Sequence, residues 1–260
     1  MKSLSNFAIG ALCACTLHAG AATLVHRYSF SGDTLDSVGG NTGVLNNGAT
    51  VTATALSLSG GPGAGASVQN MGFFNQVGIG TNFGTTGVTV ESWYTDSGSS
   101  TWAKLFTFGS AVAGQELAFT HFRGGGDLAP GLDRNGAKAL SGYPFGSNTR
   151  IPIGEEHHLV VSVAADGLTN LWVDGVQQIT NLPTNPLSSV TSNTESIGAT
   201  AWADPGHFGE VNEFRIYQGT LTDAEVIENL GLGPDQLIPE PGALAILGLA
   251  SLFGLRRRRA

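Results

Sequence analysis

Hydrophobic and polar residues alternate with a period of two over most of the chain between residues 23 and 231. Because successive side chains of a strand point to opposite faces of a sheet, this period predicts β-structure. Clusters of Gly, Asn, Asp and Ser separate the alternating segments, as expected for turns. The segments are LVHRYSF (24–30), VTVESWY (88–94), KLFTFG (104–109), QELAFTHF (115–122), HLVVSVA (158–164) and VNEFRIY (211–217). The pattern predicts a domain that is nearly all β-sheet.

Two short sequences predict local structure in this domain. In TNLWVDGVQQIT, Asp174 and Gly175 separate two strand-like runs, and Asp-Gly supplies the positive φ angles of a two-residue hairpin turn. TLTDAEVIENLG carries the domain's only helix signal, with Thr222 as N-cap, Glu225 at the capping-box position and Gly231 as the stop. About 210 residues are too many for an immunoglobulin sandwich, so we expect a jelly roll of two stacked antiparallel sheets with one short C-terminal helix.

The N-terminal sequence MKSLSNFAIGALCACTLHAGAA predicts a secretory signal peptide over residues 1–22. It has a single Lys2, an uncharged apolar core and small residues where a signal peptidase cuts. The alternative is a lipoprotein box in LCAC, with Cys15 acylated. Cys13 and Cys15 are the chain's two cysteines, so cleavage near Ala22 leaves no disulfide or Cys-metal site. Either way, we expect the protein to be exported.

The C-terminal sequence IPEPGALAILGLASLFGLRRRRA predicts a short membrane segment. Its apolar stretch, residues 242–255, has 14 residues, whereas a helix that crosses a bilayer needs about 20. The four arginines at 256–259 favour retention of that end in the cytoplasm. Residues 232–238 are expected to form a linker, since Gly and Pro stop the preceding helix. We therefore expect residues 239–260 to be a transient anchor rather than a permanent span.

The charge of the chain limits its partners. It has 12 basic and 20 acidic residues, and without Lys2, the four terminal arginines and Glu240 the balance is 7 against 19, a net charge of −12. A polyanion is not attracted to nucleic acid or to anionic lipid. The composition instead suits a surface protein that is able to hold divalent cations.

Five sequence blocks, in this order, resemble the laminin G-like, concanavalin A-like lectin/glucanase jelly-roll family. They are YSFSGD, ALSLSG, VTVESWY, EEHHLVVSVAADGLTNLWVDGVQ and GEVNEFRIYQGTLTDAEV, and they span Tyr28 to Val226. Members of this family typically combine a Glu-x-Trp strand, a Val-Asp-Gly hairpin and a final Arg-Ile-Tyr strand. The resemblance implies a laminin G-like domain over residues 23–231.

The C-terminal tail resembles a second family signature, the PEP-CTERM sorting signal. The matching residues are Pro239, Glu240, Pro241, Arg256, Arg257, Arg258 and Arg259. This resemblance implies processing by an exosortase-type membrane enzyme, and a role at the surface of a Gram-negative bacterium that makes exopolysaccharide.

The sequence does not support a glycosidase site. Glycosidases of this fold place two carboxylates on one face of a strand, about 5–5.5 Å apart in the retaining enzymes. Glu91 and Asp96 are separated by an odd number of residues, so they should point to opposite faces, and the adjacent Glu155 and Glu156 fail for the same reason. His158 is expected to be packed in a strand, and His121 to face solvent in a loop rather than to act in catalysis. We therefore expect a protein that is not an enzyme.

A calcium ion is the cofactor that the family resemblance implies. Ca²⁺ takes six to eight oxygen ligands, and relatives hold it between the exit of the first strand and the last strand. The matching residues are Asp33 and Glu213, although Asn212 stands where the family usually has Asp.

Carbohydrate is the leading candidate ligand. The C–H face of a sugar packs on an aromatic ring while its hydroxyls bond to polar side chains. The loop residues that fit are Trp102, Arg123, Tyr143, Trp202 and Asp204, whereas Trp93 and Trp172 lie in alternating strands and should be core. The predicted function is binding of carbohydrate or an extracellular matrix polymer at the cell surface. A structural or adhesive protein that binds protein partners is the alternative, and a glycoside hydrolase a third.

Overall fold

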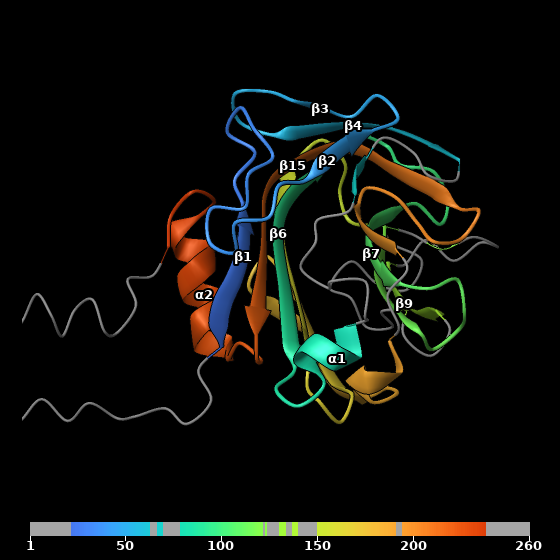
Figure 1. Ribbon diagram of the computed structural model, residues 1–260, viewed down its shortest axis with the longest axis vertical. Coiled ribbons are helices and arrows are strands. Elements are labelled where there is room, and N and C mark those ends of the chain that lie inside the picture. The colour runs from blue at the N-terminus through green and yellow to red at the C-terminus, as the bar shows by residue number, and fades with distance from the viewer. Residues whose placement is uncertain are drawn as a thin grey trace, which may run out of the picture.

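The computed structural model describes residues 22–62, 67–69, 79–121, 123, 130–133, 137–139, 150–190 and 194–237. They form the predicted all-β sandwich (Figure 1), in which the strands hydrogen-bond into one curled 15-stranded sheet, and we call its two largely antiparallel halves the first and second sheets. The first sheet has the order β1-β15-β6-β11-β12-β13. Its strands are β1 (Thr23–Tyr28), β6 (Val88–Asp96), β11 (Glu156–Val163), β12 (Leu168–Val173), β13 (Val176–Pro183) and β15 (Pro205–Gln218).

The second sheet runs from β2 through β5, β14, β7, β8 and β9 to β10. Its strands are β2 (Val44–Asn46), β5 (Ser67–Gln69), β7 (Lys104–Gly109), β8 (Glu116–Thr120), β9 (Gly131–Asp133), β10 (Ala137–Ala139) and β14 (Thr194–Ile197). One parallel pairing, Gly206 with Lys104, connects the two sheets through β15. The first half of β15 also pairs with β4 (Leu56–Pro62), which pairs in turn with β3 (Thr50–Val51).

The core between the sheets is aromatic. Phe106 and Phe108 of β7 both contact Phe214 of β15 edge-to-face, with ring centroids 5.9 and 6.2 Å apart. Such edge-to-face pairs add stability beyond the area that they bury. Tyr94 of β6 lies in the same core and contacts Phe119 of β8. The faces of the two sheets are therefore held together across the sandwich by rings.

The outer face of the first sheet is covered by α2 (Asp223–Leu232), which lies beside β1 in Figure 1. A second apolar cluster forms there, with Trp172 and Tyr217 packed near Val226 of the helix. The indole Nε1 of Trp172 donates a hydrogen bond to Asp223 Oδ1 at 3.1 Å. Trp93 and Trp172 are each 3% exposed, so the prediction that they are core residues is confirmed.

Local turn and cap chemistry behave largely as the sequence predicts. Val173 pairs with Val176 across the Asp174-Gly175 turn, whose φ angles are 51° and 74°. Thr222 and Glu225 form the predicted capping box of α2. The predicted stop at Gly231 is wrong, because Gly231 lies within α2. The helix ends at Gly233, with a φ of 77°, whose N–H donates to the Asn229 and Leu230 carbonyls.

Two short helices were not predicted. They are α1 (Ile79–Phe83) and the 3₁₀ turn η1 (Leu187–Ser189), which contact each other. Neither is long enough to show a helical hydrophobic period. No helix in the described part of the chain is both long and apolar enough to cross a membrane.

Candidate functional site

Aromatic and charged side chains gather where β7 and β8 meet the loop before β15. Trp102 lies two residues before the start of β7 and has a positive φ of 66°. Lys104 Nζ and the guanidinium carbon of Arg123 each lie 5.4 Å from the centroid of the Trp102 ring. Cations within about 6 Å of an aromatic ring are attracted by its quadrupole. The structure thus brings together two of the predicted ligand-binding residues, Trp102 and Arg123.

Lys104 connects this pair to a third predicted residue. Its side chain is 2% exposed, and Nζ donates a hydrogen bond to Thr120 Oγ1 at 2.8 Å. Asp204 Oδ2 lies 3.9 Å from the same Nζ. Lys104 is not among the residues predicted from the sequence, although lysine is rare in this chain.

Trp202 presents the most accessible ring of this region. It is 37% exposed, and its Nε1 donates a hydrogen bond to Glu116 Oε2 at 2.7 Å. Glu116 is itself 4% exposed, so the indole is fixed at its polar edge. We call the set of Trp102, Lys104, Glu116, Arg123, Trp202 and Asp204 the tryptophan patch. Tyr143, the fifth predicted ligand-binding residue, lies outside the described residues.

A shallow depression is a second candidate for small ligands. It has a volume of about 170 Å³ and is lined by Ser59, Gly60, Gly98, Ser100, Gly206 and Phe208. Phe208 is 44% exposed, and the other lining residues are glycines and serines. The depression therefore offers one exposed ring but no charged group.

A buried cluster of one carboxylate and two imidazoles adjoins the tryptophan patch. Asp96 ends β6, His121 follows β8 and His207 lies in β15, and all three are at most 1% exposed. One ligand atom of each lies within 4.8 Å of the others. His207 Nδ1 and His121 Nε2 are 2.6 Å apart. The backbone N–H of His121 bonds to the carbonyl of Ala103, the residue between Trp102 and Lys104.

Burial determines the charge of this cluster. Burial lowers the pKa of His207 to about 4, and burial together with the nearby His207 lowers the pKa of His121 well below its usual range. Burial alone would raise the pKa of Asp96, but the charge of His121, the Ser99 N–H and the Arg150 guanidinium together hold it well below its usual range. At neutral pH the cluster thus contains two neutral imidazoles and one carboxylate.

The expectation that His121 faces solvent is wrong. His121 is 1% exposed because it enters the interior at the end of β8 and stacks on His207, with ring centroids 4.6 Å apart. The sequence signal was weak, since the two histidines are 86 residues apart. Only the alternation in QELAFTHF, which places His121 on the same side as Leu117 and Phe119, indicated a buried position.

The predicted calcium ligands do not fit a calcium site. The Glu213 carboxylate is buried, and Arg27 donates to it from Nε and Nη2 at 2.8 and 3.0 Å. Arg215 and the backbone N–H of Asp235 donate to it as well. The Asp33 carboxylate accepts from the backbone N–H of Leu35 in an exposed turn. A carboxylate already bonded to two guanidinium groups has little negative potential left for a divalent cation.

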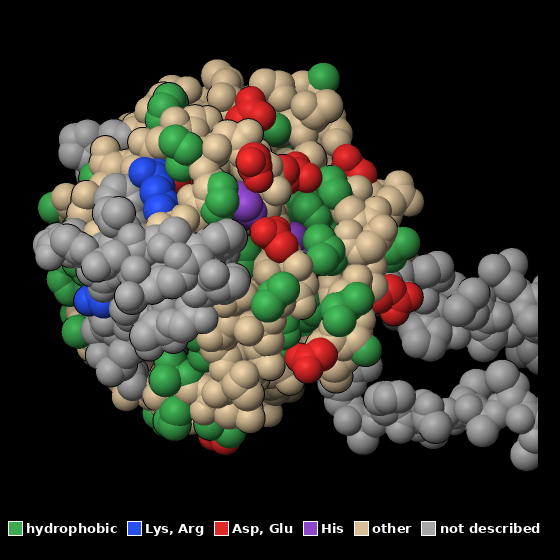
Figure 2. Space-filling model, turned by 180° about the vertical axis from the view of Figure 1, so that it is seen from behind, with side chains coloured by type: hydrophobic (Ala, Val, Ile, Leu, Met, Phe, Trp, Pro, Cys, Tyr) green, Lys and Arg blue, Asp and Glu red, His purple; other side chains and the backbone are tan. Residues whose placement is uncertain are grey.

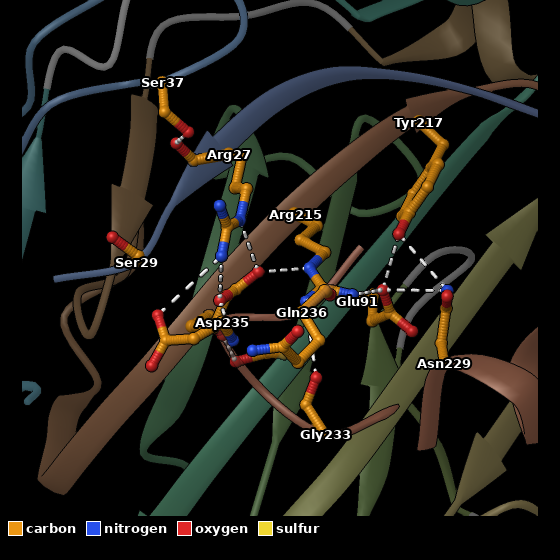
Figure 3. A network of polar contacts seen from close by, with 12 residues as sticks. Arg27, Ser29, Ser37, Glu91, Arg215, Tyr217, Asn229, Gly233, Asp235 and Gln236 are labelled. Carbon is orange, nitrogen blue, oxygen red and sulfur yellow. Dashed lines mark hydrogen bonds and ion pairs between the residues drawn. The ribbon is translucent and has the colours of Figure 1, made fainter. Parts of the chain in front are cut away.

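Glu213 belongs instead to a buried polar network on the outer face of the first sheet (Figure 3). Burial raises the pKa of Glu213, but the hydrogen bonds and charges of its arginine partners lower it more, so the pKa lies below its ordinary value. Burial lowers the pKa of Arg215, but the charges of Glu91 and Glu213 raise it more. Arg215 Nη2 also donates to the Gln236 carbonyl at 2.6 Å. The network thus ties the segment after α2 to β15.

Glu91 lies in the same network, away from Asp96. Its carboxylate bonds to His158, Tyr217, Asn229 and Arg215 beneath α2, whereas Asp96 lies in the buried histidine cluster. The prediction that the two carboxylates face opposite sides is therefore confirmed. His158 is packed and hydrogen-bonded, as predicted, at 2% exposure.

The two terminal segments are not covered by the described residues. The signal-peptide prediction falls on residues 1–22, of which only Ala22 is described, and the sorting-signal prediction falls on residues 239–260. On the face shown in Figure 2, acidic side chains are spread over the surface and Lys and Arg side chains are few. This distribution agrees with the acidic charge of the chain.

Comparison with known proteins identifies the architecture. The Laminin_G_3 family, described as the concanavalin A-like lectin/glucanases superfamily, matches residues 74–227. Domain 4 of AbnA, a GH43 extracellular arabinanase from Geobacillus stearothermophilus solved with arabinotriose, is 20% identical with a TM-score of 0.57. The alignment covers 80% of this chain and 98% of that domain. None of the curated proteins compared with the chain matches it.

Two further structures share the fold at lower identity. Trypanosoma rangeli sialidase is 14% identical with a TM-score of 0.53, over 78% of this chain and 32% of the sialidase. The binding domain of botulinum neurotoxin DC, solved with rat synaptotagmin II, is 11% identical with a TM-score of 0.52, over 80% and 51% of the two chains. The chain thus spans about a third of the sialidase. At these identities the likeness concerns the fold alone.

Proposed function

This chain belongs to the concanavalin A-like lectin/glucanase superfamily, and we propose that it is an exported carbohydrate-binding protein without catalytic activity. The observation that carries the proposal is the tryptophan patch. It combines an exposed indole, Trp202, with fixed charged groups around a second tryptophan. Sugar sites need this combination, because aromatic rings contact the C–H faces while polar groups bond to the hydroxyls.

The arrangement of Trp202 suits a binding platform. Its hydrogen bond to the buried Glu116 holds the ring in one orientation before any ligand arrives. A fixed ring loses little conformational entropy on binding, so more of the contact energy contributes to affinity. Asp204, whose side chain is 31% exposed, adds an acceptor in the same loop and lies 3.9 Å from the buried Lys104 Nζ. The arabinotriose complex of the AbnA domain supports the choice of carbohydrate as ligand class.

The non-catalytic part of the proposal is supported by the positions of the carboxylates. Glu91 is enclosed beneath α2 by four side-chain partners, and Asp96 is enclosed with two histidines. The two face opposite sides of β6, so they do not form the carboxylate pair of a glycosidase. Export and removal of the C-terminal tail by an exosortase-type enzyme complete the proposal, on the sequence patterns of residues 1–22 and 239–260.

Glycan-array binding of the purified full chain, followed by titration with the best ligand, tests the proposal. We expect Trp202→Ala to weaken binding at least tenfold, which corresponds to about 1.4 kcal/mol, and Trp202→Phe to lose less because it keeps a ring. Ile227→Ala is the matched control, since Ile227 is 59% exposed on α2, away from β7 in Figure 1. Its affinity should equal that of the unmodified chain.

Other outcomes would overturn parts of the proposal. If Phe208→Ala abolishes binding while Trp202→Ala does not, the ligand occupies the shallow depression instead. Release of reducing ends from the bound glycan would show a hydrolase. Absence of binding to any glycan, together with capture of a defined surface protein by the wild-type chain but not by Trp202→Ala, would favour the adhesive alternative.

A further inference from the structure

The buried histidine cluster contains the donor atoms of a metal site. Asp96, His121 and His207 come from three separate segments, and their ligand atoms converge to within 4.8 Å. We propose that these three residues bind one divalent transition-metal ion of the zinc class, and that the ion links the two sheets of the sandwich. This inference is independent of carbohydrate binding.

The donor set selects the class of metal. Two imidazole nitrogens and one carboxylate suit Zn²⁺ and its neighbours Co²⁺, Ni²⁺ and Cu²⁺. Ca²⁺ takes six to eight oxygen ligands, which two histidines do not supply. Three protein ligands leave a tetrahedral Zn²⁺ with one position for water or another donor. The cluster therefore differs in chemistry from the calcium site that Asp33 and Glu213 were expected to form.

The facing ring nitrogens of the two histidines mark the position that we assign to the ion. His207 Nδ1 and His121 Nε2 face each other at 2.6 Å, where one ring donates an N–H to the other, and a metal ion would take the place of that proton. Of the other ring nitrogens, His121 Nδ1 has no hydrogen-bond partner among the described residues, whereas the backbone of Thr95 and Glu210 lies close to the His207 ring. When the facing nitrogens bind an ion, these two nitrogens carry the ring protons.

Only a small movement is needed to admit the ion. A metal about 2.0–2.1 Å from both nitrogens requires them to be about 2.9 Å apart at a right angle, or about 3.3 Å apart in a tetrahedron. The rings must therefore separate by less than about 1 Å. His121 directly follows the end of β8 and His207 is the third residue of β15, so both histidines lie near strand ends.

Arg150 is the group that competes with the metal. Its Nη2 bonds to Asp96 Oδ2 and, at 3.0 Å, to the Ser99 carbonyl. Asp96 Oδ1 already accepts from the N–H groups of Gly98 and Ser99, so the metal must share or take the Oδ2 side. The Arg150 side chain is 23% exposed and is therefore able to turn toward solvent when a cation binds.

A metal at this position would act as a cross-link. Asp96 and His207 lie on β6 and β15 of the first sheet, and His121 follows β8 of the second. The described residues contain no cysteine, so no disulfide connects the sheets there. A ligand that binds only the folded chain stabilises it by mass action, and 100-fold excess over Kd corresponds to a rise of roughly 5–10 °C in Tm for a domain of this size.

Metal titration of the chelator-treated, purified full chain tests the proposal. We expect one equivalent of Zn²⁺ to bind, with a rise in Tm of that size, and Ca²⁺ to have no effect at the same concentration. Co²⁺ should give visible absorption bands typical of a four-coordinate site with nitrogen ligands, which Zn²⁺ then removes. These measurements use the wild-type chain and do not depend on any variant folding.

Variants locate the site. His121→Gln and His207→Gln should each abolish the Zn²⁺-dependent rise in Tm, with melting in chelator as the check that they fold. His26→Gln is the matched control, because His26 is also buried and bonded to an aspartate but lies on β1 outside the cluster. Arg150→Gln should bind Zn²⁺ several-fold more tightly, since it removes the competing cation. Failure of wild type to take up one equivalent of Zn²⁺ or Co²⁺, or unchanged uptake in His207→Gln, would overturn the proposal.

Discussion

Glu91 accepts hydrogen bonds from four side chains in the space beneath α2, and its removal should cost more stability than that of an exposed glutamate. Its Oε2 bonds to Tyr217 Oη at 2.7 Å, Asn229 Nδ2 at 3.2 Å and Arg215 Nη1 at 3.3 Å. Its Oε1 lies 2.9 Å from His158 Nε2. Glu91 and Arg215 are both fully buried, so water cannot replace the lost contacts.

The expected loss follows from the uncompensated charge that remains. Removing one member of a buried ion pair typically costs about 3–5 kcal/mol, so Glu91→Ala should lower Tm by roughly 6–20 °C in a domain of this size. Glu91→Gln keeps the volume and one acceptor and should lose about 1.5–3 kcal/mol, the range for a hydrogen bond to a charged group. Arg215 retains Glu213 in both variants, which limits the loss.

Urea denaturation followed by tryptophan fluorescence measures the effect directly. The Trp93 ring lies 4.5 Å from the guanidinium of Arg215, so the probe reports on the network itself. Glu156→Gln is the matched control, because Glu156 is exposed on β11 and bonds to Asn212, and it should change stability by less than about 0.5 kcal/mol. Equal midpoints for Glu91→Ala and Glu156→Gln would refute the reasoning.

Two further changes test the cap of α2 and a surface ion pair. Thr222→Ala should destabilise the protein by about 1 kcal/mol because it removes the capping box. Thr222→Ser keeps the hydroxyl and should be nearly neutral in the same urea experiment. An equal loss of stability in both variants would exclude the cap as the cause. Burial lowers the pKa of His157, but the hydrogen bond and charge of Asp174 raise it more, so the pKa is raised overall. The pair therefore stabilises the fold most below pH 6.5 and progressively less as the pH rises through the folded-state pKa. The difference in Tm between wild type and His157→Gln should thus be larger at pH 5.5 than at pH 8.5. The effect corresponds to less than about 1 kcal/mol because the Asp174 side chain is 43% exposed. A difference in Tm that does not change with pH would contradict this prediction.

Local sequence chemistry predicts the elements of this fold well. The Asp174-Gly175 turn and the Thr222 capping box depend on residues within a few positions of one another, and both are present. The two-residue period likewise places KLFTFG on β7 at the predicted bounds and Trp93 in a packed position. These features depend on backbone dihedral preferences and side-chain alternation, which short windows of sequence contain.

The sites depend on contacts that no short window contains. His121 and His207 are 86 residues apart, and Arg27 reaches Glu213 across 186 residues. Without the topology, His121 resembled a loop histidine and Glu213 a free carboxylate for calcium. The sequence did indicate Trp102, Arg123, Trp202 and Asp204 individually. The contacts of Trp102 and Asp204 with Lys104, of Arg123 with Trp102 and of Trp202 with Glu116 depend on the pairing of β7 with β8 and on the loop before β15.

The segment after α2 determines how the domain responds to a mechanical pull on its C-terminal side. Arg215 holds the Gln236 carbonyl and Glu213 holds the backbone N–H of Asp235, and both side chains belong to β15 (Figure 3). A force applied at Leu237 therefore enters the sheet at β15, whose hydrogen bonds to β1 and β6 run along its length, rather than unwinding α2 from its last turn. These two contacts, one made by Arg215 and one by Glu213, transmit tension in the tail to the strands.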